Sequence, residues 1–325
     1  MSVGLADILA AAERLEGVAV RTPLIEHPAL NALAKGRVLL KAECLQLTGS
    51  FKIRGAYNAM AQIPAELAAR GVVAWSSGNH AQGVAKAGQL LGIGTRIVMP
   101  ADAPVAKRDN THRLGGELVE YDRYREDREE IAREIARRSG AALVPSFDHP
   151  DIIAGQGTAG LEMVEQAQAQ GAELTQALIC CGGGGLTAGC AIAIKALEPA
   201  VRIHTVEPAD YDDTARSLAA GRRISVDPSV PSICDALLTP RPGELTFDVL
   251  KQNVAGGLVV SEADVRAAMR YAFRELKLVL EPGGAVALAA VLLGKIPTEG
   301  ETTAVMLSGA NVDERLFGEI QAEPN

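Results

Sequence analysis

The chain has 325 residues, of which 48% are hydrophobic and 22% charged, a composition typical of a folded protein with one large domain or two ordinary ones. It excludes intrinsic disorder, collagen and repeat arrays. The net charge of −8 argues against a nucleic-acid partner, because phosphate backbones are bound by basic surfaces, so small molecules are the expected ligands.

The first expected element is an amphipathic helix over residues 1–17, where Asp7 and Glu13 interrupt the apolar stretch and argue against a secretory signal. Short β-branched runs then alternate with Ala-rich helical stretches. This alternation indicates an α/β fold with mostly parallel sheets and helices on both faces. Strands are predicted at residues 37–43, 71–76, 95–100, 116–122, 142–147, 177–181, 202–208 and 302–308.

The series between Gly71 and Phe147 indicates a smaller domain inserted within a larger one. It ends in the charged segment 121–138, which we expect to form a helix with a solvated face, because opposite charges recur at i,i+3 and i,i+4.

The five cysteines have no Cys-x-x-Cys spacing and are interpreted as packing residues in a reducing compartment, so we expect a cytoplasmic protein. The uncharged segment 177–194 is long enough to cross a membrane, but four glycines interrupt it. We therefore expect strand, loop and buried helix there, and no membrane partner.

Lysine chemistry is suggested within residues 41–57, where Thr48, Gly49 and Ser50 form a turn before a predicted helix. Lys52 then lies in the first helical turn, where the helix dipole lowers its pKa and favours the neutral amine that a Schiff-base nucleophile needs. From spacing alone, a surface lysine after a capped turn remains the better interpretation.

Residues 75–83 form a polar turn between an apolar strand and a helix. Backbone N–H groups at the helix start, beside Ser, Asn and His side chains, suit a carboxylate. Simple helix capping is an equal alternative, although α/β proteins place ligands at such turns.

Four glycines at residues 182–185 lie between a buried strand and an Ala-rich helix. They cost backbone entropy, and a phosphate held by successive amides explains them better than tight packing. The spacing Gly183-x-Gly185-x-x-Ala188, with Glu207 closing the next strand, also fits a dinucleotide fingerprint. An NAD-dependent oxidoreductase therefore stays an alternative.

The acidic cluster at residues 207–213 supplies oxygen ligands that suit Mg²⁺, Mn²⁺ or Ca²⁺, although capping of a helix over residues 214–221 is the plainer explanation. Two further turns lie at residues 280–285 and 307–311. Either turn could contact the ring of a bound ligand or could only reverse the direction of the chain.

The motifs SFKIRGA, SSGNHAQG, AGQGT, GGGGL, EPGGA and LSGAN occur together and in this order, and the chain thereby resembles the pyridoxal-phosphate (PLP) enzymes of fold type II. The similar group is that of serine/threonine dehydratases and serine racemases, and the resemblance runs over residues 21–313. It implies a tryptophan synthase beta-like fold with two open, mostly parallel twisted sheets, and a homodimer. It also implies a large PLP-binding domain at residues 1–52 and 149–325, and a small domain at 53–148 that closes over the substrate.

By this resemblance the catalytic residues are Lys52, which binds PLP covalently and takes the substrate's α-proton, and Ser77, which exchanges a proton on the opposite face. The other expected cofactor contacts are Phe51 against the ring, Asn79 at the 3′-oxygen, Gly182, Gly183, Gly184, Gly185 and Leu186 at the phosphate, Glu281, and Ser308 at the pyridine nitrogen. The expected substrate contacts are Ser76, Ser77, Asn79 and His80, and the expected ligands of Mg²⁺ or Mn²⁺ are Glu207, the Tyr211 carbonyl and Asp213.

The implied reaction is an α,β-elimination that converts L-threonine and L-serine into a 2-oxo acid and ammonia. Ser77 is typical of serine racemases, whereas threonine dehydratases commonly have Ala there, so racemisation stays open. Ala81 and residues 147–150 resemble the dehydratases. Dehydration of 3-hydroxyaspartate or phenylserine also stays open, and Arg128, which aligns with an arginine near the substrate mouth of serine racemases, favours the acidic substrate.

Overall fold

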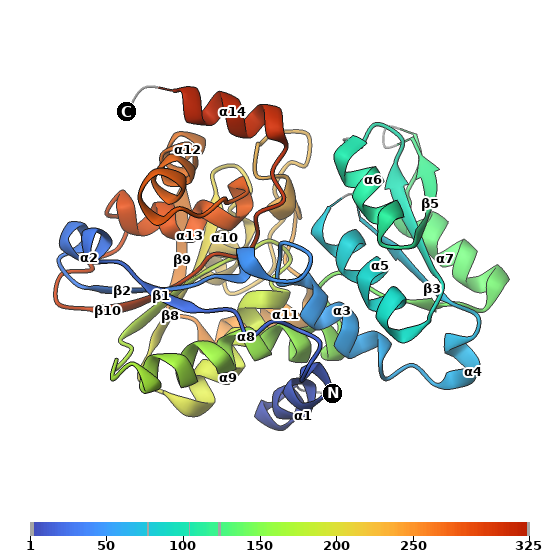
Figure 1. The fold of residues 1–325 in the computed structure, drawn as a ribbon, viewed down its shortest axis with the longest axis horizontal. Coiled ribbons are helices and arrows are strands. Elements are labelled where there is room, and N and C mark those ends of the chain that lie inside the picture. Colours follow the sequence, from blue (N-terminus) through green and yellow to red (C-terminus); the bar gives the residue numbers. More distant parts are fainter. Residues whose placement is uncertain (1–2, 77, 104, 123–124, 324–325) are drawn as a thin grey trace.

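The computed structural model describes residues 3–76, 78–103, 105–122 and 125–323, which fold around two separate sheets (Figure 1). The large sheet has the strand order β1-β2-β10-β7-β8-β9, with β1 antiparallel to β2 and all other neighbours parallel. Its strands are β1 (Leu24–Glu26), β2 (Arg37–Lys41), β7 (Gln176–Cys180), β8 (Arg202–Pro208), β9 (Gly256–Val260) and β10 (Thr302–Met306).

Helices cover both faces of the large sheet, as its buried central strands require (Figure 1). One face carries α1 (Leu5–Leu15), α8 (Pro150–Ala169) and α9 (Gly185–Leu197). The other carries α2 (Pro28–Ala34), α12 (Glu262–Tyr271), α13 (Pro282–Leu292) and α14 (Glu314–Ala322). The remaining helical elements of this body are α10 (Asp213–Ala220), α11 (Glu244–Asn253), the short η1 (Glu43–Leu45) and η2 (Asp235–Leu237), and the π-helical η3 (Ala272–Leu276).

The small sheet has the order β5-β4-β3-β6 and is parallel throughout. Its strands are β3 (Val72–Trp75), β4 (Thr95–Pro100), β5 (Gly116–Tyr121) and β6 (Ala142–Leu143). Its helices are α4 (Ala65–Ala68), α5 (Asn79–Leu91), α6 (Val105–Arg113) and α7 (Arg128–Ser139). We call this sheet with its helices the small body, and the large sheet with its helices the large body. Helix α3 (Lys52–Met60) lies where the two bodies meet (Figure 1).

The predicted α/β architecture is confirmed, with three local corrections. Strands β1 and β9 were not predicted, and the strand expected at 142–147 ends at Leu143. The charged helix begins at Arg128 rather than at residue 121, because Asp127 caps it by accepting the N–H groups of Glu129 and Glu130. All strands of the small sheet fall within residues 53–148, while the exact domain boundaries remain a prediction.

Glycines let three helices cross closely around the joint between the bodies. A Cβ on Gly155 in α8 would lie 2.6 Å from the carbonyl oxygen of Arg54 in α3. A Cβ on Gly189 in α9 would lie 2.3 Å from the carbonyl oxygen of Ile153 in α8. The AGQGT motif is therefore a packing motif that sets how near α3 and α9 approach α8.

All five cysteines are free and buried, as predicted for packing residues. No helix in the described part of the chain is both long and apolar enough to span a lipid bilayer.

Candidate active site

The start of α3 is fixed to the turn that follows β10. The Phe51 N–H donates to the Ser308 carbonyl at 3.2 Å, and the Ala310 N–H donates to the Gly49 carbonyl at 2.8 Å. Lys52 is the next residue and opens the helix, as the sequence predicted. Two segments far apart in the chain therefore hold this lysine in a defined position.

The Lys52 amine is partly buried and donates to the Ser146 carbonyl at 2.9 Å. Burial lowers the pKa of Lys52 to about 8, against the weaker opposing influence of Cys180 and Glu281. The direction agrees with the prediction from sequence, whereas the cause is desolvation rather than the helix dipole. The amine also lies 5.2 Å from the centroid of the Phe51 ring.

The glycine loop lies beside this lysine. Phe147, the residue after Ser146, packs onto the loop so closely that a Cβ on Gly183 would lie 2.5 Å from its ring. A Cβ on Gly185 would lie 3.0 Å from the Phe147 Cα. Because Lys52 donates to Ser146, the residue before Phe147, the Lys52 amine lies next to the glycine loop. A lysine and a phosphate-binding loop that serve the same ligand must lie close together in this way.

The loop leads into an uncapped helix. Gly184, the N-cap of α9, has φ +94, which favours glycine, and within the described residues it gives the first N–H groups of the helix no side-chain cap. Thr246 supports the loop by donating to the Gly183 carbonyl at 2.7 Å. Gly182 and the buried Leu186 flank this turn. Unsatisfied amides at the positive end of a 13-residue helix fit a phosphate.

A second uncapped helix start belongs to α5, whose N-cap Gly78 provides no side-chain bond. Ser76 accepts the Gly78 N–H at 3.2 Å, and Ser77 lies outside the described residues. His80 is buried, and its Nε2 lies 2.9 Å from the Val144 carbonyl. Because no side-chain cap from Gly78 satisfies them, the first backbone N–H groups of α5 suit an anion such as a carboxylate, as far as the described residues go.

His80 is neutral in this setting. Burial, together with the charge of Lys52, lowers the pKa of His80 to about 3. Its ring is engaged with the small sheet, so the imidazole anchors α5 rather than supplying charge to a ligand.

A short polar chain connects α5, the start of α13 and the turn after β10. Asn79 donates to Glu281 at 2.5 Å, and Asn311 donates to the Asn79 side-chain oxygen at 2.6 Å. Burial, together with the charge of Asp235, raises the pKa of Glu281 to about 7. The predicted cofactor contacts Asn79 and Glu281 are therefore bonded to each other, which fixes the Asn79 amide.

Ser308, at the end of β10, is buried beside Cys180. Burial raises the pKa of the Cys180 thiol to about 11, although a hydrogen bond with Ser308 opposes this rise. The structure thus brings Lys52, the glycine loop, Asn79, Glu281 and Ser308 to one region at the carboxyl ends of the strands.

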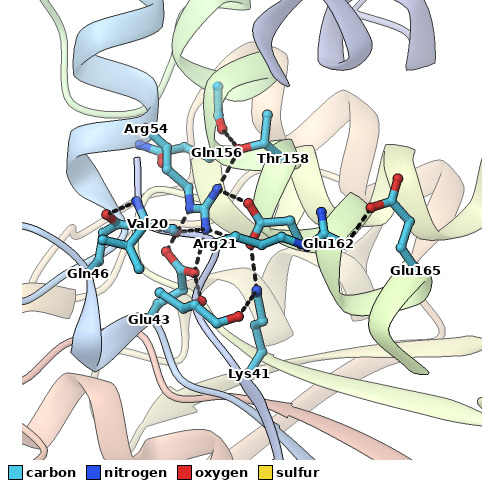
Figure 2. Close-up of polar contacts among 12 residues, drawn as sticks. Val20, Arg21, Lys41, Glu43, Gln46, Arg54, Gln156, Thr158, Glu162 and Glu165 are labelled. Atoms are coloured by element: carbon cyan, nitrogen blue, oxygen red, sulfur yellow. Dashed lines mark hydrogen bonds and ion pairs between the residues drawn. The ribbon is translucent and has the colours of Figure 1, made fainter. Parts of the chain in front are cut away.

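A buried ionic network surrounds Arg54, which follows Lys52 by two residues in α3 (Figure 2). Arg54 donates to both oxygens of Glu43 at 2.8 Å and to both oxygens of Glu162 at 2.7 and 2.9 Å. Lys41 adds a bond to Glu162 at 2.6 Å. Burial lowers the pKa of Arg54, but the two carboxylates outweigh this and raise it. This network was not predicted, although a lysine ending an apolar strand was a visible signal.

The residues predicted to hold a cation lie around the start of α10. Glu207 accepts the Thr214 and Ala215 N–H groups at 2.9 and 2.7 Å. Both oxygens of the buried Asp213 carboxylate lack a hydrogen-bond partner, and burial raises the pKa of Asp213 to about 7. An unpartnered buried carboxylate fits a hard cation. Among the described residues, no three or more His, Cys, Asp or Glu side chains form a metal-binding group.

The same contacts bear on the dinucleotide alternative. Glu207, which would bind a ribose in that case, is buried and engaged with α10. The hydroxyl of Tyr211, another residue of the acidic cluster, donates to the carbonyls of Pro228 and Val230 and so ties the cluster to a neighbouring loop. Both oxygens of Glu207 are therefore already engaged with the backbone of α10, as helix capping requires.

Comparison with known proteins gives a consistent result. A family model described as pyridoxal-phosphate dependent enzyme matches residues 15–309. L-threo-3-hydroxyaspartate ammonia-lyase of Pseudomonas sp is 42% identical over 314 residues, which cover 97% of each chain. The solved structure of threonine deaminase from T.th. superposes with a TM-score of 0.90 at 44% identity, covering 95% of this chain and 99% of that one. Maize serine racemase superposes with a TM-score of 0.93 at 35% identity, covering 98% and 97%.

Proposed function

The chain belongs to the family of pyridoxal-phosphate dependent enzymes, within its dehydratase and racemase branch, and from this premise we propose an ammonia-lyase for β-hydroxy amino acids. The proposed substrates are L-serine and L-threonine, and the products are a 2-oxo acid and ammonia. The observation that carries the proposal is the low-pKa amine of Lys52 beside two uncapped helix starts, those of α5 and α9.

The residues of the site fit PLP. Lys52 would bind it covalently, residues 182–186 would hold its phosphate, and Phe51, Asn79, Glu281 and Ser308 would surround its ring. When bound, PLP withdraws electrons from the substrate's Cα and so acidifies the Cα–H bond. The protein's own contribution is to position the reacting groups.

Different groups of the site have different roles in the elimination. The Lys52 amine accepts the α-proton, a role that the lowered pKa of Lys52 supports because a neutral amine can act as a base. The start of α5 would hold the substrate carboxylate with Ser76, Ser77, Asn79 and the backbone of His80. Loss of the β-hydroxyl as water leaves an enamine, which hydrolyses to the 2-oxo acid and ammonia.

Two further reactions have specific support. The similarity to maize serine racemase, together with Ser77 in the motif SSGNHAQG, supports racemisation of serine as a second activity. The similarity to the 3-hydroxyaspartate ammonia-lyase of Pseudomonas sp supports an acidic substrate. Replacing Ser77 by Ala should suppress D-serine formation and spare elimination, and equal loss of both would contradict this role.

A Mg²⁺ or Mn²⁺ ion at Asp213, Glu207 and the Tyr211 carbonyl is part of the proposal, and the unpartnered carboxylate of Asp213 supports it. Added Mg²⁺ should raise the melting temperature of the wild-type protein but not that of Asp213→Asn, and an equal response of both would contradict the site. A homodimer and a cytoplasmic location stay predictions.

The test of the function is a spectrum and an assay. Purified protein should be yellow, lose its visible band with hydroxylamine, and release 2-oxo acid from serine, threonine, 3-hydroxyaspartate or phenylserine. Lys52→Ala should abolish turnover, while the control Lys86→Ala, at a lysine that donates to the exposed Gln89, should retain it. Normal activity in Lys52→Ala would overturn the mechanism.

A further inference from the structure

A second lysine reaches from the small body to the large one at the candidate site. Lys107, on α6, forms an ion pair with Asp235 in η2, and its side chain is only 13% exposed. The next residue, Arg108, instead pairs with Glu120 and donates to the Ala101 carbonyl within its own body. Of these two neighbouring cations, Lys107 alone makes a described ion pair across the joint.

The short helix η2, which carries the partner of Lys107, packs against the cofactor cradle. Leu237, two residues after Asp235 in η2, lies 3.3 Å from where a Cβ on Gly182 would be and 3.2 Å from where one on Gly283 would be. Residue 182 begins the glycine loop, and residue 283 lies in the first turn of α13. The ion pair therefore sits at the rim of the site rather than on a remote surface.

Electrostatics links the same pair to the buried acid of the site. Asp235 raises the pKa of Glu281 after burial, whereas Lys107 and Lys52 both lower it. Glu281 in turn accepts the hydrogen bond from Asn79. Lys107 is thus a second ammonium group near Glu281 and Asn79, and the mechanism given above leaves it unused.

We propose that Lys107 determines specificity by binding the side-chain carboxylate of an acidic β-hydroxy amino acid, and that Asp235 occupies this place in the free protein. The inference rests on the proposed function and names its substrate class. The Asp235 carboxylate is an internal stand-in for the carboxylate of a dicarboxylic substrate such as L-threo-3-hydroxyaspartate. Serine and threonine lack this group, so they leave the ion pair of Lys107 undisturbed.

The rival cation is Arg128, which the family resemblance associated with an acidic substrate. It is exposed at the first position of α7. An exposed arginine in water binds a carboxylate weakly, whereas a largely buried lysine beside the cradle binds it more strongly. The geometry therefore favours Lys107.

The experiment measures a selectivity ratio: kcat/KM for L-threo-3-hydroxyaspartate divided by kcat/KM for L-serine. Lys107→Gln should lower this ratio about ten- to a hundredfold, the value of a charge-assisted hydrogen bond. The matched control Arg108→Gln should leave the ratio unchanged. An equal fall of both kcat/KM values in Lys107→Gln would overturn the inference, as would a larger fall of the ratio in Arg128→Gln.

Two further measurements separate this inference from the proposed function. Calorimetric titration of the holoenzyme with succinate, which has two carboxylates and no reacting amine, should give binding at least about tenfold weaker in Lys107→Gln. Asp235→Asn should lower KM for 3-hydroxyaspartate because the internal competitor is gone, and a higher KM would contradict the stand-in role. If the wild type turns over no hydroxy amino acid, the proposed function fails, and unequal succinate binding still supports Lys107 while equal binding overturns it.

Discussion

The protonation of Lys52 depends on its burial. Its amine has a carbonyl partner, Ser146, and two acidic groups near it, Cys180 and Glu281, which favour the charged form. Desolvation outweighs these influences and brings the pKa to about 8. Near neutral pH the protein therefore keeps a substantial share of this lysine as the neutral nucleophile.

Capture of PLP by the cofactor-free protein should follow this pKa. Protonated Lys52 cannot attack an aldehyde, so the rate should rise about tenfold per pH unit below pH 8 and level off above about pH 9. Stopped-flow absorbance after mixing with PLP measures it. The control is Nα-acetyl-lysine, whose exposed side-chain amine should give a rate that keeps rising to pH 10. The same continued rise in the protein would contradict the effect of burial.

At the scale of secondary-structure elements, the position of α9 matters most because this helix carries the glycine loop. Its packing on α8 leaves no room for a side chain at Gly189, where a Cβ would lie 2.3 Å from the Ile153 carbonyl oxygen. The nearest atoms belong to the backbone of α8, so they cannot yield without moving a helix. The placement of the cradle thus depends on a glycine in α9 that lies outside the cradle itself.

Gly189→Ala should destabilise the protein by about 1–3 kcal/mol, the usual cost of overpacking, and weaken PLP binding by shifting α9. Urea unfolding and fluorescence titration with PLP measure the two effects. The control is Gly318→Ala in α14, where nothing lies within 4 Å of the added Cβ and helix propensity should give a gain of up to about 1 kcal/mol. Equal stability of the two variants would refute the packing argument.

The sequence predicted those elements that have a local signal. Strands such as β7 and β10 are continuous apolar runs, and α3 begins at Lys52 as its turn residues indicated. Strand β1 has three residues and β9 begins with two glycines, so neither carries a clear strand pattern. The cofactor lysine and the glycine loop were found through motifs, whereas the contact of Phe147 with the loop depends on tertiary packing that no local pattern encodes.

For the whole molecule, the buried network around Arg54 holds α3 against the large body. It joins Lys41, the last residue of β2, and Glu43, the first residue of η1, to Glu162 on α8, more than a hundred residues away in the chain (Figure 2). No local pattern predicts such partners. With two cations and two carboxylates the charges balance, so the network is stable only while it is complete.

Arg54→Met should therefore lower the free energy of unfolding by about 3–5 kcal/mol, because Glu43 and Glu162 lose their buried partner. The control is Arg21→Met, which breaks the exposed ion pair with Glu165 and should cost at most about 1 kcal/mol. Urea unfolding of both variants measures the difference. Similar losses in the two would show that burial adds nothing to the value of the Arg54 contacts.

The hydrogen bond from Lys52 to Ser146 has a mechanical consequence. The chain enters the small body at the start of α3 and leaves it just after β6, and this bond joins the two crossings. A rotation of the small body would have its pivot at the reactive nitrogen itself. The lever arm at that atom would then be nearly zero, so we expect the amine to stay in register with the glycine loop if the small body closes over a substrate as the resemblance implies.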